Sequence, residues 1–105
     1  MSKLENYMVL HLTLKKRWFD LIASGEKTEE YRDLKAYWST RLGRFRFGST
    51  PRAVKFVNGY GASRPTVVVE LSGISLGYGR EEWGAPLCRE VYILKLGRIL
   101  LKANF

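Results

Sequence analysis

The chain has 105 residues, 46% of them hydrophobic and 27% charged, which suits one globular domain and argues against both disorder and a second domain. There are 18 lysines and arginines against 10 aspartates and glutamates, giving a net charge of +8. An excess of that size favours contact with a polyanion, either nucleic acid or an acidic protein. A basic surface that only keeps the protein in solution has the same composition.

The composition also narrows the chemistry. Cys88 is the only cysteine and His11 the only histidine, which excludes a disulfide framework and argues against a zinc site and a Cys-His nucleophile. We therefore expect no metal and no cofactor, and a structural role for His11, which lies in an apolar alternating run. No apolar run approaches ~18 residues and no leader is recognisable, so we expect a cytoplasmic protein that does not interact with membranes.

Hydrophobic periodicity predicts an α+β domain in which strands outnumber helices. Trp18, Leu21 and Ile22 follow the spacing of an amphipathic helix that Gly25 ends, and the valine-rich run after Pro65 indicates a central strand. Asp33 is the expected N-cap of a second helix, and Gly97 the expected bend in the last strand. The expected strands are 7–14, 27–32, 53–57, 66–71 and 90–101, and the expected helices are 15–24 and 34–42.

Lys15, Lys16 and Arg17 lie in the first turn of the first expected helix, where the helix dipole disfavours positive charge. Local stability therefore does not explain them. Together with the free N–H groups of a helix N-terminus they would bind an anion such as phosphate. Three exposed charges that only raise solubility are the alternative.

Aromatic residues in three other places are candidates for contact with nucleic acid. Arg44 and Arg46 alternate with phenylalanines, a pattern that fits stacked bases and also a half-buried strand. Tyr60 stands between two glycines in a turn, and Trp83 lies in a loop, 77–89, that is longer than a simple turn requires.

The stretch Gly25-x-Lys27-x-x-Glu30-x-Arg32, directly after the first helix, resembles the motif of ASCH domains, the ASC-1 homology group of the PUA-like superfamily. Phe56-Val57-Asn58-Gly59-Tyr60-Gly61 and Glu82-Trp83-Gly84 are also similar to short ASCH-like proteins of bacteria and phages. The resemblance covers nearly the whole chain, so we expect residues 1–105 to form one ASCH-like domain.

This resemblance implies a small, curled, mostly antiparallel β-barrel flanked by short helices, with a cleft that binds RNA. Some small ASCH proteins are amidohydrolases of N4-acetylcytidine that use the motif lysine, a threonine three residues later and a glutamate from a later strand. In this chain the lysine is Lys27, the threonine position holds Glu30, and Glu70 is the candidate for the later glutamate.

The absent threonine weakens the catalytic interpretation. A lysine that acts as a base needs a lowered pKa, and a neighbouring Glu30 carboxylate works against this. In a regular strand Glu30 and Arg32 share a face and tend to pair. The motif therefore predicts, first, a basic cleft for RNA or another single-stranded nucleic acid, lined by Lys27, Glu30 and Arg32. The alternatives are a hydrolase of a modified nucleoside, a ribonuclease, and a module that binds an acidic protein.

Overall fold

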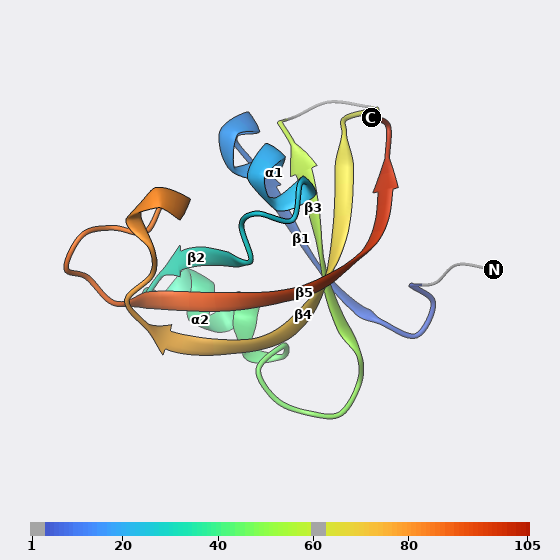
Figure 1. Ribbon diagram of the computed structural model, residues 1–105. Helices are drawn as coiled ribbons and strands as arrows, with labels where there is room; N and C mark the ends of the chain where they lie inside the picture. The colour runs from blue at the N-terminus through green and yellow to red at the C-terminus, as the bar shows by residue number, and fades with distance from the viewer. Residues whose placement is uncertain (1–3, 60–62) are drawn as a thin grey trace.

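The computed structural model describes residues 4–59 and 63–105. Within these residues no helix is long and apolar enough to cross a membrane. The described residues form two α-helices and five strands. The two longest strands, β4 and β5, run together across the molecule (Figure 1). In chain order the elements are β1 (Met8–Leu14), α1 (Lys16–Ala23), β2 (Glu29–Asp33), α2 (Ala36–Gly43), β3 (Arg52–Asn58), β4 (Thr66–Gly77), the single 3-10 turn η1 (Glu81–Trp83) and β5 (Val91–Ala103).

The five strands form one open, mixed sheet in the order β1-β3-β4-β5-β2. The expected closed barrel is wrong, because β1 and β2 are the two edges of the sheet and pair with β3 and β5 rather than with each other. The sheet is also not wholly antiparallel, since β1 runs parallel to β3. That parallel pair requires a crossover connection, and the intervening chain supplies α1, β2 and α2.

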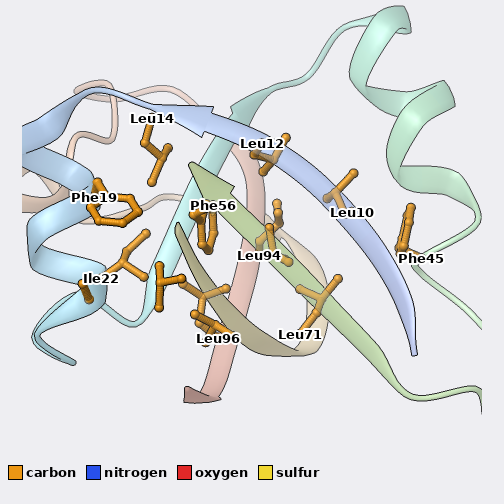
Figure 2. Packing of buried hydrophobic residues seen from close by; sticks show 14 of the residues in the cluster. Leu10, Leu12, Leu14, Phe19, Ile22, Phe45, Phe56, Leu71, Leu94 and Leu96 are labelled. Atoms are coloured by element: carbon orange, nitrogen blue, oxygen red, sulfur yellow. The ribbon is translucent and has the colours of Figure 1, made fainter. Parts of the chain in front are cut away.

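Both helices contribute to the core on one face of the sheet. Alternate residues of the strands point to this face and pack with Phe19 and Ile22 of α1, as Figure 2 shows. Leu42 of α2 belongs to the same core. The strand residues of this core are Leu10, Leu12, Leu14, Val54, Phe56, Val67, Val69, Leu71, Tyr92, Leu94 and Leu96.

A smaller cluster on the other face anchors the loop between β4 and β5. Tyr31, Ala85, Val91 and Ile93 are buried together there, and Trp83 packs against them. The backbone of the loop approaches closely, since a Cβ on Gly79 would lie 2.4 Å from Cε1 of Tyr31. The loop therefore packs on the face of β2 that carries Tyr31, and the N–H of Arg80 donates to the Tyr31 hydroxyl at 3.0 Å.

Several local expectations also need correction. Residues 44–47 form turns instead of a strand, because the backbone N–H groups of Phe45 and Arg46 bond back to Leu42 and Gly43 at the end of α2. Asp33 is the last residue of β2, and Lys35 takes the N-cap position of α2. His11 was expected to have a structural role, but its side chain is exposed on β1 and does not belong to the core. The central strand at 66–71 is confirmed and continues to Gly77.

Candidate functional site

The corner between α1 and β2 is fixed by its backbone. Gly25 has φ +86°, a conformation that favours glycine, and its N–H bonds to the carbonyl of Ile22 at 3.0 Å. The N–H of Lys27 bonds to the carbonyl of Leu21 at 2.9 Å, two residues before β2 begins. Lys27 therefore precedes the strand, and the alternation of strand side chains does not decide where it points.

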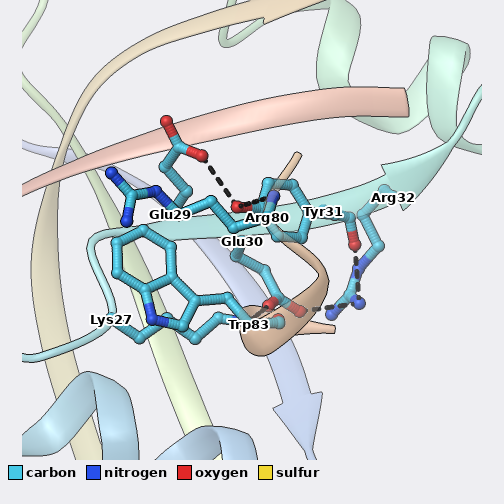
Figure 3. A network of polar contacts seen from close by, with 7 residues as sticks. All are labelled: Lys27, Glu29, Glu30, Tyr31, Arg32, Arg80 and Trp83. Carbon is cyan, nitrogen blue, oxygen red and sulfur yellow. Dashed lines mark hydrogen bonds and ion pairs between the residues drawn. The ribbon is translucent and has the colours of Figure 1, made fainter. Parts of the chain in front are cut away.

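The amine of Lys27 is buried beside the first residues of β2 (Figure 3). Its Nζ donates to Oε1 of Glu30 at 2.7 Å and to the backbone carbonyl of Trp83 at 2.7 Å. It also lies 4.9 Å from the ring centre of Trp18 and 5.4 Å from that of Tyr31. The Lys27 side chain is only 1% exposed, so the amine has almost no contact with solvent.

Two opposing effects set the protonation of this amine. Burial lowers the pKa of Lys27 from its usual value, while the Glu30 carboxylate raises it and the Arg32 guanidinium lowers it. The net direction is downward, with burial the largest cause. The sequence argument treated Glu30 as the deciding neighbour, and the structure shows that burial outweighs it.

Glu30 connects Lys27 to Arg32. Its second oxygen, Oε2, accepts from Nη1 of Arg32 at 2.8 Å, which confirms the expected pair on one face of β2. Both carboxylate oxygens therefore have a cationic partner. Among residues 4–59 and 63–105, the buried Nε of Arg32 has no hydrogen-bond partner, and an unpaired buried donor costs free energy.

A cavity of about 510 Å³ opens beside this ion-paired group. It lies between the end of β1, the start of α1 and β2, and two of its lining side chains are cations while one is a carboxylate. Because Glu30 already binds Lys27 and Arg32, the lining has an excess of positive charge. The cavity is lined by Thr13, Leu14, Lys15, Trp18, Glu30, Arg32 and Gly59.

The three basic residues of α1 have different environments. Lys15 lines the cavity. Lys16 points elsewhere and pairs with Asp20 one turn later at 2.6 Å, with both side chains exposed. Arg17 lies 4.6 Å from the ring centre of Trp18, next to the cavity wall. Of the predicted phosphate contacts in this turn, only Lys15 lines the same cavity as Arg32.

Glu70, the candidate for the later catalytic glutamate, lies on the opposite face of the sheet. Its neighbours Val69 and Leu71 both point into the main core, so the side chain between them points away from it. Glu70 has the partner that a carboxylate on a central strand requires, because Oε1 accepts from Nε of Arg98 at 3.1 Å. It lines a separate cavity of about 390 Å³, together with Tyr7 and residues 48–52. The structure does not bring Glu70 and Lys27 together.

The remaining predicted contacts do not line the cavity. Arg44 is exposed after α2, and the guanidinium carbon of Arg46 lies 5.8 Å from the ring centre of Tyr92. Trp83 contributes its backbone carbonyl to Lys27, and Arg80 stacks over its ring at 4.7 Å. Tyr60 lies outside the described residues.

The sequence argument did not name Trp18 as a site residue, and it expected Trp38 only as part of the core or a groove wall. Trp18 was assigned to the apolar stripe of α1, yet its ring forms a wall of the cavity. Trp38 of α2 is half-buried, and the guanidinium of Arg32 lies 5.0 Å from its ring centre. A tryptophan next to a cluster of basic residues, as at 15–18, was the signal available for the first. Nothing in the sequence linked Trp38 to Arg32, because that contact depends on how α2 packs.

Comparison with protein-family models, with curated proteins and with solved structures gave no significant match. The resemblance to ASCH domains therefore depends on the motif alone and stays a prediction.

Proposed function

We propose that this protein binds single-stranded nucleic acid, most simply RNA, through the cavity between α1 and β2. The observation that carries the proposal is the cavity lining, which places Lys15 and Arg32 beside Trp18 while the one carboxylate, Glu30, is already paired twice. Cations next to an aromatic ring suit a phosphate and its neighbouring base. The net charge of +8 supports the same class of ligand.

A phosphate in the cavity would meet several positive groups. It would lie beside the guanidinium of Arg32, which lines the cavity. It would also face the N-terminus of α1, where Lys15 is the N-cap and provides no side-chain hydrogen bond to the first-turn N–H groups. Lys15 itself would contribute a further charge. Together these groups favour an anionic ligand, although each of them alone would be a weak argument for one.

We propose recognition rather than hydrolysis. A lysine base and a glutamate that share a reaction must lie within direct or one-water hydrogen-bond reach, and Glu70 points to the other face of the sheet. The lowered pKa of Lys27 favours catalysis, but its amine is buried and already donates to Glu30 and to the carbonyl of Trp83. We interpret Lys27 as a group that positions Glu30 and Arg32.

The test compares two neighbouring lysines of α1. Lys15→Gln and Lys16→Gln remove the same charge from exposed positions one residue apart, and only Lys15 lines the cavity. We expect Lys15→Gln to weaken binding of a labelled single-stranded RNA about tenfold at low salt. It should also lower the slope of log affinity against log salt by about 0.7. Lys16→Gln should bind nearly as the wild type does. Fluorescence anisotropy over a salt series measures both quantities.

Two results would contradict the proposal. The first is no binding of single-stranded RNA or DNA by the wild-type protein at low salt. The second is an equal loss of affinity in Lys15→Gln and Lys16→Gln, which would mean that the overall charge attracts the strand and the cavity has no part in it. Capture of an acidic protein that resists nuclease treatment, without binding of nucleic acid, would favour the protein partner instead.

A further inference from the structure

Three residues of α2 form a second cationic and aromatic surface next to the cavity. The indole of Trp38 has the guanidinium carbon of Arg32 at 5.0 Å from its ring centre and that of Arg41 at 5.4 Å. Tyr37 meets the same indole edge-on, with the ring centres 4.9 Å apart. We name Tyr37, Trp38 and Arg41 the α2 platform. Arg32 lines the cavity and touches the platform, so the two surfaces are continuous.

The guanidinium of Arg41 is held in place although it lies at the surface. Its Nη2 donates to the backbone carbonyl of His11 on β1 at 3.0 Å, and its Nη1 donates to the hydroxyl of Tyr37 at 3.4 Å. Among residues 4–59 and 63–105 no carboxylate pairs with it. An oriented guanidinium without a counter-charge loses little conformational freedom when it binds an anion.

Tyr37 gives the platform an exposed ring. Its side chain is 57% exposed, whereas Trp38 is half-buried and packs against the main core. The guanidiniums of Arg32 and Arg41 both lie near the Trp38 ring, which also packs against the main core, so part of the indole is already covered. The surfaces left for a ligand are the Tyr37 ring and the outer face of the Arg41 guanidinium, and both stack well on nucleobases.

We propose that the α2 platform is the subsite for a second nucleotide of the same strand, whose neighbouring nucleotide occupies the cavity. This inference rests on the proposed function. The phosphate of the second nucleotide contacts Arg41, and its base stacks on Tyr37 or on the guanidinium. The guanidinium carbons of Arg32 and Arg41 lie 5.0 and 5.4 Å from the same ring centre, so they are at most about 10 Å apart. Phosphates of one strand, spaced by about 3.4 Å or more per nucleotide, can match such a distance.

A subsite of this kind makes affinity depend on the length of the strand. A mononucleotide fills the cavity alone, whereas a short oligonucleotide gains one charge contact and one stacked base. Each such base contributes about tenfold or more in affinity. The ligand class that the two surfaces select is thus an oligonucleotide and not a free nucleotide.

The experiment measures how affinity changes with the length of the strand in the wild type, in a double variant of the α2 platform and in a control double variant. Uridine 5′-monophosphate and oligouridylates of two to about four nucleotides compete with a labelled strand. The wild type should gain about tenfold or more in affinity with length. Tyr37→Ala combined with Arg41→Gln should lose most of that gain and bind the mononucleotide within about twofold of the wild type. Tyr78→Ala combined with Arg89→Gln removes an exposed tyrosine and an exposed arginine outside the cavity and the platform and serves as the matched control.

The outcomes separate this inference from the proposed function. If the wild type binds no strand, the proposed function fails and this inference fails with it. If the wild type and the platform variant gain equally with length, the platform is not a subsite while the cavity proposal stands. A platform variant that also loses the mononucleotide contradicts the inference, because Tyr37 and Arg41 would then support the cavity. Urea unfolding of each variant shows whether the fold is intact in the binding assay.

Discussion

Two glutamates on opposite faces of one sheet show how position changes the meaning of the same side chain. Glu30 lies on the edge strand β2, is 5% exposed, and binds Lys27 and Arg32 at 2.7 and 2.8 Å. Glu70 lies on the central strand β4 and binds Arg98 at 3.1 Å, and the Arg98 side chain is 80% exposed. The loop between β4 and β5 contacts this buried group, because the carbonyl of Trp83 accepts from Nζ of Lys27 at 2.7 Å.

The difference lies in solvent access. Water screens the Glu70 pair, so either partner can be lost at little cost. The Glu30 carboxylate is almost fully buried between two cations, so the loss of any one of these charges leaves another charge buried without its partner. A binding site benefits from that dependence, because it orients Arg32 beside the cavity before any ligand arrives.

The largest effect is expected for Glu30→Ala. The substitution leaves the ammonium of Lys27 and the guanidinium of Arg32 next to each other without a counter-charge. Removal of one partner from a buried ion pair costs about 3–5 kcal/mol of unfolding free energy. Urea unfolding at neutral pH measures the loss.

A second variant shows whether charge is the cause. Replacing Lys27 as well, in Lys27→Met with Glu30→Leu, removes one buried cation together with the carboxylate and should recover a large part of the stability. A double variant as unstable as Glu30→Ala would mean that packing at this position matters more than charge.

The sequence predicted much of the fold because strand and helix patterns are local. The alternation in 7–14, the valine run at 66–71 and the helix stop at Gly25 all appear in the structure. Closure of the sheet was not predictable in this way. The opening depends on which strand takes each edge, and β2 pairs with β5 across the 57 residues that separate the two strands. Such non-local pairing leaves no periodic signal in the sequence.

The candidate site was predicted in part for the same reason. Glu30 and Arg32 pair as two residues of one strand should, and Lys15 was a candidate from its place at a helix start. The buried environment of Lys27 depends on the carbonyl of Trp83, which is 56 residues away in the chain. The place of Glu70 on the other face became clear only when its neighbours were seen in the core.

An effect of intermediate size is expected on the stability of the protein as the pH changes, because of the Lys27 amine. Its pKa is lowered in the folded protein, so between that pKa and about 10.5 the unfolded chain binds more protons and the wild type gains stability as pH rises. Below the folded pKa the cost of the buried charge is complete. Lys27→Met removes this dependence of stability on pH, but it leaves the carbonyl of Trp83 without its donor. The free energy of unfolding of this variant at neutral pH should therefore differ from that of the wild type by about 1–2 kcal/mol in either direction.

The measurement compares both proteins from about pH 7 to about pH 10. The wild type should gain on Lys27→Met as pH rises, by at most about 1.4 kcal/mol per pH unit. Burial raises the pKa of Tyr31, so near the upper end of this range the unfolded chain loses that proton before the folded protein does. Tyr31 is present in both proteins, so its contribution is removed when the two are compared. A difference that stays constant with pH would contradict a lowered pKa for Lys27.

The smallest effect is expected for Glu70→Gln, the counterpart of the first variant. The Arg98 guanidinium lowers the pKa of Glu70, so the pair contributes stability above the usual glutamate range and loses it as pH falls through the folded value. Because Arg98 is exposed, we expect only a slight loss at neutral pH and low salt, and almost none at high salt or in acid. RNA binding should be unchanged, because Glu70 lines a different cavity from Arg32. A loss of stability close to that of Glu30→Ala would mean that screening by water does not distinguish the two glutamates.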